Sequence, residues 1–299
     1  MQVTVIHNPT AGNGEMSVEK LSEMMEAYGY RFRIHSSKEA DLPAILAEPA
    51  DLVAVAGGDG TVGKVLRTLP DRSRPVAVLP MGTANNIARS LGIEGQPQDL
   101  LRSWSEGRTK RFDIGVAVGP WGRRRFIEAI GVGTVAQAMA QADATDLPQE
   151  GEINHARRII CDVIRQAKAG CPIVTVDEWT LPEDLLFVEV MNINHLGPNL
   201  PVAPFADSGD GLLDIAYVRE HQREEFLAWL DDQKARTPPP FQLERGKRIG
   251  MTWSGEPLRV DDEFMAPPEG GGAIIIELEE EPLRIVISSD SGHSQQSGG

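Results

Sequence analysis

The chain has 299 residues, enough for about two domains at roughly 150 residues each. It is 41% hydrophobic and 24% charged, a globular balance that excludes a disordered or collagen-like polymer. The formal net charge of −15 falls entirely on residues 113–299, because residues 1–112 carry 13 basic and 13 acidic side chains. Such acidity repels a phosphate backbone, so we expect no nucleic-acid partner.

Cysteine content and apolar runs bear on the compartment. Two cysteines, Cys161 and Cys171, are too few for a disulfide framework and indicate a reducing cytoplasm. The N-terminal MQVTVIHNP resembles no signal peptide, and no apolar run approaches the roughly 18 residues of a transmembrane helix. Two basic clusters, Arg123–Arg125 and Arg157–Arg158, leave a membrane-surface contact open, although solvated arginines are the favoured interpretation.

The first third of the chain alternates strand and helix patterns. Short β-branched runs predict strands at residues 3–8, 31–36, 51–58 and 75–80. Helical spacing covers residues 18–28, between a Ser17 N-cap and Gly29, and further helices are predicted at 61–69, 85–91 and from 100 to 104. This order predicts a doubly wound parallel α/β sheet, which we assign to a domain of residues 1–112.

After residue 112 the pattern changes to closely spaced strands. Nine strand-like runs separated by turn residues predict a mostly antiparallel β-sandwich or barrel, which we assign to a sandwich domain of residues 113–287. Two helical insertions interrupt it, at roughly 134–169 and 221–236. Residues 288–299 lack apolar anchors and are predicted to be a disordered tail.

A glycine-rich loop follows the strand at 51–58 and opens a helix. It comprises Gly57, Gly58, Asp59, Gly60 and Thr61. Glycines there let backbone N–H groups approach an anion, and the helix N-terminus adds partial positive charge, so the loop suits a polyphosphate. A tight turn alone would explain the first two glycines but leaves the carboxylate of Asp59 without a role.

Two common nucleotide motifs are absent. Gly58, Gly63 and Lys64 fit the spacing of a P-loop, but Val65 follows and has no hydroxyl for Mg²⁺. The first strand is not followed by GxGxxG, which disfavours an NAD-dependent dehydrogenase.

Three loops together give a more specific pattern. NPTAG (residues 8–12), GGDGT (57–61) and PMGTANNIA (80–88), in this order, resemble the catalytic domain of the diacylglycerol kinase family, which includes sphingosine kinases and bacterial lipid kinases. NAD kinases share a GGDGT-type loop, so the second half of the chain decides between the two families. There, residues 190–214 and the VDDEF of residues 260–264 also resemble the diacylglycerol kinase family. The resemblance covers about residues 1–285. It implies an NAD kinase/diacylglycerol kinase-like first domain followed by a β-sandwich.

The resemblance also implies site residues. Those around ATP would be Asn8, Pro9, Thr10, Gly12, Ser36, Gly57, Gly58, Asp59, Gly60, Thr61 and Thr83. Asp59 would engage the Mg²⁺ of ATP, and Asp261 or Glu263 would be the catalytic base. A structural Mg²⁺ would lie at Asp210 with the backbone carbonyls of Asp207 and Leu212. From the residues alone, a solvated acidic turn at 261–263 would be favoured; the resemblance reverses that preference.

Several positions depart from the family pattern. Gly63 and Lys64 replace the usual Asn and Glu, and Lys64 either reaches a phosphate or lies in solvent, with solvent favoured. Asn86 replaces an Asp, and Asp262 replaces the glycine of the DGE triplet. These changes bear on activity more than on fold.

We therefore predict an ATP-dependent lipid kinase that transfers the γ-phosphoryl group to a lipid hydroxyl. A diacylglycerol-like lipid is the first of the candidate acceptors. The alternatives are a kinase of a soluble acceptor and a non-catalytic nucleotide-binding module. The lipid substrate would be met at a membrane surface by a cytoplasmic, transiently membrane-associated enzyme, and a homodimer is allowed. An acyl slot could be formed by residues 135–139, 159–164 and 226–230, although plain core packing is the favoured interpretation.

Overall fold

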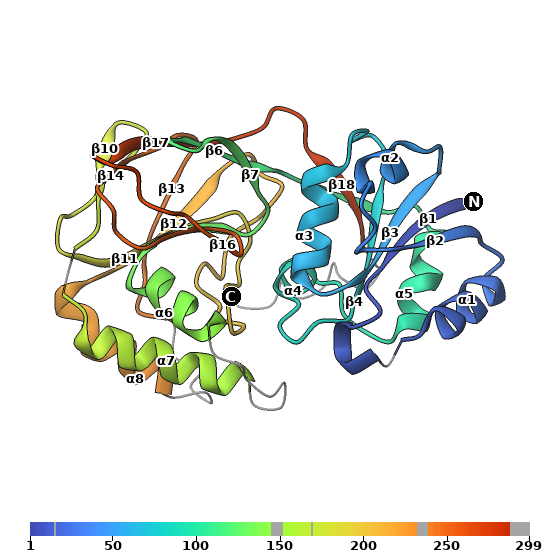
Figure 1. The fold of residues 1–299 in the computed structure, drawn as a ribbon, viewed down its shortest axis with the longest axis horizontal. Helices are drawn as coiled ribbons and strands as arrows, with labels where there is room; N and C mark the ends of the chain where they lie inside the picture. The colour runs from blue at the N-terminus through green and yellow to red at the C-terminus, as the bar shows by residue number, and fades with distance from the viewer. Residues whose placement is uncertain (15, 145–151, 169, 232–238, 288–299) are drawn as a thin grey trace, which may run out of the picture. The chain divides into compact units, whose positions relative to one another are not determined.

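The chain divides into two compact units (Figure 1). The computed structural model describes residues 1–14, 16–144, 152–168, 170–231 and 239–287. The first unit contains Met1–Asp113 and the segment that begins at Glu280, and the second contains Ile114–Glu279. The predicted tail at residues 288–299 lies outside the described residues.

A six-stranded sheet forms the centre of the first unit. Its strands, in spatial order, are β2 (Arg31–Ser36), β1 (Gln2–His7), β3 (Leu52–Gly57), β4 (Val76–Pro80), β18 (Leu283–Val286) and β5 (Thr109–Phe112). The first five run parallel, and β5 is antiparallel to β18. Every residue of β3 is buried, as expected for a strand covered on both faces.

Helices cover both faces of this sheet. They are α1 (Val18–Ala27), α2 (Leu42–Ala47), α3 (Asp59–Thr68), α4 (Asn86–Ser90) and α5 (Pro97–Trp104), with a 3₁₀ turn η1 (Ala11–Gly14). Figure 1 shows α3 on one face and α1 and α5 on the other. The predicted Ser17 cap is confirmed, since its side chain accepts a hydrogen bond from the Lys20 N–H at 3.2 Å. The short α2 was not predicted, because its six residues give too little helical period.

The last strand departs from the prediction. The sequence pattern places the run at residues 283–286 in the second domain, yet β18 joins the first sheet between β4 and β5. Its apolar pattern resembles that of the sandwich strands, and only its pairing partners distinguish it. The nearly parallel sheet of the first unit is therefore completed by a segment from the far end of the chain.

Two antiparallel sheets form the second unit. One contains β10 (Trp179–Thr180), β9 (Ile173–Val176), β14 (Ile249–Trp253), β17 (Gly272–Leu278), β6 (Gly115–Gly119) and β7 (Gly122–Phe126). The other contains β13 (Gln242–Gly246), β12 (Leu213–Arg219), β11 (Leu185–Met191), β8 (Ala129–Gly133), β15 (Leu258–Val260) and β16 (Glu263–Phe264). The predicted fold class, α/β followed by an antiparallel β-sandwich, is confirmed.

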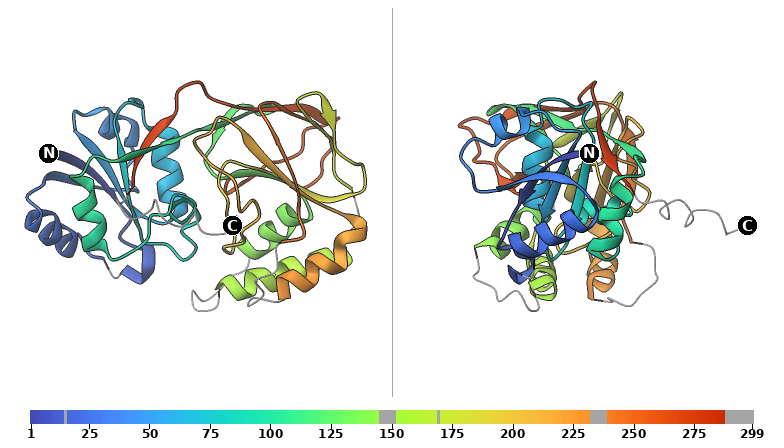
Figure 2. Two further views of the ribbon diagram at one scale, coloured as in Figure 1. Left: turned by 180° about the vertical axis from the view of Figure 1, so that it is seen from behind. Right: turned by 90° about the vertical axis from the view of Figure 1, so that its right-hand side faces the viewer.

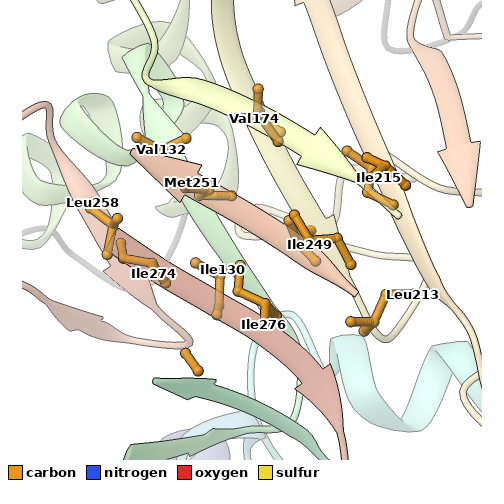
Figure 3. Close-up of a cluster of buried hydrophobic side chains, with 14 of the residues drawn as sticks. Ile130, Val132, Val174, Leu213, Ile215, Ile249, Met251, Leu258, Ile274 and Ile276 are labelled. Carbon is orange, nitrogen blue, oxygen red and sulfur yellow. The ribbon is translucent and has the colours of Figure 1, made fainter. Parts of the chain in front are cut away.

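The two sheets enclose an apolar core. Figure 3 shows side chains such as Ile130 and Val132 of one sheet together with Ile249, Met251 and Ile274 of the other. Alternate residues of each strand supply this core, as pleated strands require.

Three helices cover the outer face of the sheet that contains β11. They are α6 (Thr134–Asp143), α7 (Glu152–Gln166) and α8 (Arg223–Asp231), the last preceded by a 3₁₀ turn η2 (Glu220–Gln222). Both face-on views show them grouped on one side of this unit (Figures 1 and 2). The two predicted helical insertions are confirmed within the described residues; 145–151, 169 and 232–238 lie outside them.

The apolar spacing in these helices, for which the sequence left an acyl slot open, is explained by packing against the sheet. Val135, Ile160, Ile164, Phe226 and Leu230 belong to one buried cluster with β11 and β12, which is core packing. None of the helices in the described parts of the chain is long and apolar enough to cross a membrane.

Candidate functional site

Three loops leave the same edge of the first sheet. Strands β1, β3 and β4 are parallel neighbours, so the segments after them emerge together at their carboxyl ends, where ligands of open α/β sheets bind. The Asn8 N–H donates to the Ala56 carbonyl at 2.9 Å, and the Met81 N–H donates to the Gly57 carbonyl at 2.9 Å. The loops after β1 and β4 are thus each tied at their first residue to β3.

Glycines let these loops approach one another without side chains between them. A Cβ on Gly12 would lie 2.7 Å from the Met81 carbonyl oxygen, and Gly12 has a φ of +57°. A Cβ on Gly58 would lie 3.0 Å from the Gly82 Cα. The result is an edge lined by backbone, which is the kind of surface that cradles phosphate oxygens.

Polar side chains complete this edge. The Asn8 Nδ2 donates to the Thr61 Oγ1 at 3.3 Å, and the Thr10 backbone and hydroxyl both donate to the Asn8 Oδ1, at 3.2 and 2.9 Å. Ser36 ends the neighbouring strand β2, and Thr83 is exposed in the loop after β4. The residues that the resemblance assigned to ATP therefore lie along one edge of one sheet.

Asp59 has a structural role that its motif did not reveal. Its carboxylate accepts the N–H of Asn86 at 2.9 Å and of Ile87 at 3.0 Å, which are the first two residues of α4. Burial raises the pKa of Asp59. The backbone hydrogen bonds and the positive charge of Arg89 both oppose this rise. Asp59 therefore fixes the start of α4 against the start of α3.

Lys64 is engaged with protein and not simply solvated. Its ammonium donates to the Ser37 carbonyl at 3.0 Å, which links α3 to the end of β2. Lys64 is exposed, as the favoured placement in solvent predicts, but its ammonium also has a protein partner.

The acidic turn of the second unit separates its two candidate bases. Asp261 has a φ of +52° and is 4% exposed. Its carboxylate accepts the backbone N–H groups of Ile127, Glu128 and Ala129 at 2.8 to 3.3 Å. Among the described residues Asp262 is not one with positive φ, so the backbone here does not require the glycine of the family pattern.

A buried ion pair supports this turn. The Arg259 Nη2 lies 2.7 Å from the Glu189 Oε2, and its Nη1 donates to the Asp261 carbonyl at 2.7 Å. Both residues pair with Gly131 on the intervening strand β8, where a Cβ would lie 2.4 Å from the Glu189 oxygens. Burial raises the pKa of Glu189, and Arg259 opposes the rise. Sequence reasoning missed this pair, because no local motif connects its members.

Glu263 is the exposed one of the two candidate bases. It forms an ion pair with Arg124 of β7, while Arg123 and Arg125 pair with Glu279. The cluster Arg123–Arg125, interpreted from sequence as solvated, is therefore paired with acids.

The residues that the resemblance assigned to a structural Mg²⁺ have other partners. Asp210 pairs with Arg245 through one carboxylate oxygen and accepts the Leu212 N–H at 3.0 Å through the other. The Asp207 carbonyl accepts the Asp210 N–H at 3.2 Å. Within the described ranges no group of three or more His, Cys, Asp or Glu side chains is arranged to hold a metal. The Arg245 guanidinium already contacts Asp210 and Asp214 and would repel a second cation, so these residues do not fit a resident Mg²⁺.

Comparison with known families assigns both units. Residues 2–117 match the diacylglycerol kinase catalytic domain, and residues 128–267 match the YegS C-terminal NAD kinase beta sandwich-like domain. The fold and these matches define a phosphotransferase that uses an alcohol group as acceptor.

Individual relatives give the family. A diacylglycerol kinase of Staphylococcus aureus (strain MRSA252) is 30% identical over 273 residues, 87% of this chain and 85% of that protein. A diacylglycerol kinase of Bacillus subtilis (strain 168) is 25% identical over 236 residues, 75% of each chain. The chain belongs to the diacylglycerol kinase family, as the sequence motifs predicted.

Solved structures show the same fold. A diacylglycerol kinase structure from Bacillus anthracis has a TM-score of 0.69 at 20% identity, covering 96% of this chain and 97% of the other. An NAD kinase from Archaeoglobus fulgidus in complex with ATP has a TM-score of 0.56 at 15% identity, covering 97% and 95%.

Proposed function

We propose that this chain is an ATP-dependent lipid kinase that transfers the γ-phosphoryl group to a lipid hydroxyl. A diacylglycerol-like lipid is the first of the candidate acceptors. The observation that carries the proposal is the backbone-lined edge, where the loops containing Gly12, Gly58 and Gly82 meet. Family membership and the ATP complex of the A. fulgidus NAD kinase support ATP as the donor. Mg²⁺ enters with ATP, as the counter-ion of its triphosphate.

The nucleotide residues of the proposal are those along the edge of the first sheet. Backbone N–H groups of the loops and the side chains of Asn8, Thr10 and Thr83 would surround the phosphates, because preorganised donors stabilise the charge of the transferring group. The Asp59 carboxylate has roughly four acceptor sites, of which the N–H groups of Asn85, Asn86 and Ile87 use three, which leaves one for the Mg²⁺ of ATP.

Glu263 is the base of the proposal. A base must reach the acceptor hydroxyl and take its proton, and Glu263 is exposed, whereas the Asp261 carboxylate is buried against three backbone N–H groups. Arg124, which pairs with Glu263, would orient the carboxylate. Asp261 is therefore proposed as a positioning residue for the turn.

The acceptor determines where the enzyme works. A diacylglycerol-like substrate lies in a membrane and ATP in the cytoplasm, so we propose a cytoplasmic enzyme that contacts the membrane surface transiently. A homodimer is the proposed assembly, and light scattering on the purified chain would distinguish it from a monomer.

Transfer of label from ATP to lipid tests the function. The chain is incubated with labelled MgATP and vesicles that contain diacylglycerol, and the product is identified by mass. We expect a labelled phosphomonoester of the lipid. A labelled water-soluble product would instead favour a soluble acceptor, and ATP binding without transfer would favour a non-catalytic module.

Matched variants test the roles of the acids. Glu263→Gln is expected to lower turnover by about 10²- to 10⁴-fold, the usual contribution of a general base. Asp261→Asn should keep measurable transfer but lower stability, because its new amide faces the Ile127 N–H.

Asp59→Asn should abolish transfer in a folded protein. Glu269→Gln is the control for Glu263→Gln, because Glu269 is an exposed acid of the same unit as Glu263, and it should change nothing. Equal turnover for Glu263→Gln and Glu269→Gln would exclude Glu263 as the base.

A further inference from the structure

The loop between Asp207 and Asp214 concentrates negative charge. Three carboxylates, those of Asp207, Asp210 and Asp214, lie within eight residues of sequence. The Asp207 carboxylate accepts the Gly209 N–H at 3.1 Å, and the Asp210 carboxylate accepts the Leu212 N–H at 3.0 Å. Backbone hydrogen bonds shape the loop, but they add no full positive charge, so a cation is needed nearby.

Arg245 supplies that cation from the neighbouring strand. Arg245 of β13 is the cross-strand partner of Asp214 in β12. Its Nε lies 3.1 Å from the Asp214 Oδ1, and its Nη2 pairs with the Asp210 Oδ2. The side chain of Asp214 is 7% exposed, so one guanidinium joins a buried carboxylate of the sheet to a more exposed one of the loop.

A guanidinium and a divalent cation require different surroundings. Mg²⁺ needs near-octahedral oxygen ligands at 2.0–2.1 Å and retains several waters. A guanidinium is planar and carries several N–H donors in a fixed fork that matches carboxylates. Asp210 presents one oxygen to the fork of Arg245 and the other to a backbone N–H, which is the arrangement of an arginine site.

We propose that Arg245 closes the loop of residues 207–214 in place of a resident divalent cation. The loop then needs no metal to fold. Mg²⁺ would act in this protein only as the partner of ATP, a corollary that rests on the proposed function. The loop assignment itself does not depend on that function, because it concerns stability without nucleotide.

The experiment measures the thermal unfolding of the full chain without nucleotide or lipid. Wild type is compared in EDTA and in millimolar MgCl₂, and bound metal is measured after purification and desalting. We expect less than one equivalent of retained divalent metal and the same unfolding temperature in both buffers. Retained stoichiometric metal, or an unfolding temperature that falls in EDTA and returns with Mg²⁺, would overturn the proposal.

Removal of the guanidinium should create a metal dependence. Arg245→Gln leaves Asp210 and Asp214 without their cation, so its unfolding temperature should fall, and Mg²⁺ should restore about 2–4 °C of it. Arg248→Gln is the matched control, because Arg248 makes an exposed ion pair with Glu277 in the same unit. It should respond to neither EDTA nor Mg²⁺.

A conservative variant covers the case in which Arg245→Gln does not fold. Arg245→Lys keeps the charge but lacks the fork, so it should unfold between wild type and Arg245→Gln and show a smaller Mg²⁺ response. A lysine variant with the stability of wild type would show that charge alone suffices and would refute the forked contact. No readout depends on kinase activity, so a failed lipid kinase assay and a failed Arg245 test remain distinguishable.

Discussion

The loop after β3 and the turn between β15 and β16 each present an acid, but they are built in different ways. Around Asp59, glycines bring backbone segments into contact, and the carboxylate itself caps α4. Around Glu263, buried side chains hold the turn by hydrogen bonds. Asp261 accepts backbone N–H groups, and Arg259, which pairs with Glu189, donates to the Asp261 carbonyl. The first site depends on glycines that have no side chain, and the second depends on buried charged side chains. Different substitutions should therefore disrupt the two sites.

The largest effect is expected from breaking the buried pair. Arg259→Met leaves the Glu189 carboxylate buried without its partner, which should lower the free energy of unfolding by about 3–5 kcal/mol. Denaturant unfolding measures this loss. The double variant Arg259→Met/Glu189→Leu should recover most of the stability, because an apolar pair needs no charge compensation.

The double variant also separates stability from function. It lacks the hydrogen bond from Arg259 to the Asp261 carbonyl, so the turn loses a support although the core is repaired. We expect restored stability with reduced kcat. A double variant no more stable than Arg259→Met would contradict the view that uncompensated charge causes the loss.

A smaller effect is expected at the nucleotide edge. Gly12→Ala forces a Cβ to within 2.7 Å of the Met81 carbonyl at a φ of +57°. The strained backbone should reduce stability by about 1–3 kcal/mol, and separation of the two loops should raise the KM for ATP. Activity at varied ATP, together with denaturant unfolding, measures both effects.

Gly29→Ala is the matched control for this variant. Gly29 follows α1 with a φ of +71°, but a Cβ there meets nothing within 4 Å. It should share the loss of stability but leave the KM for ATP unchanged. An equal rise in KM for both variants would mean that backbone strain, and not the contact between loops, governs nucleotide binding.

The two sites also differ in how far sequence could predict them. The loops at residues 8–12, 57–61 and 80–88 are contiguous motifs, and parallel β1, β3 and β4 necessarily bring them to one edge. The capping of α4 by Asp59 could not be predicted, because its partners lie 27 and 28 residues further along the chain.

In the second unit the unpredicted contacts span longer separations. Glu189 and Arg259 are 70 residues apart and meet only because β11 and β15 both pair with β8. Arg245 is 35 residues from Asp210 and lies on β13, a strand absent from the prediction. Strand alternation predicts most of the strands of this unit, but strand order decides which charges meet.

The smallest effect is expected at Lys64, which belongs to the first region but resembles the second in using a charged side chain. Its ammonium bonds the Ser37 carbonyl at the end of β2, an interaction of about 0.5–1.5 kcal/mol. Lys64→Met should loosen the contact between α3 and β2, so the KM for ATP should rise a few-fold while kcat stays constant. Steady-state kinetics at saturating lipid measure both.

Lys38→Met separates the bond from the charge. Lys38 is exposed on the segment that follows β2, so its removal subtracts the same charge from the same edge without breaking the link from Lys64 to Ser37. If the hydrogen bond matters, only Lys64→Met raises the KM. If both variants raise it equally, and added salt abolishes the difference from wild type, the lysines act through their field on the approaching triphosphate. The edge would then depend on charge as well as on its glycines, and the contrast with the acidic turn would narrow.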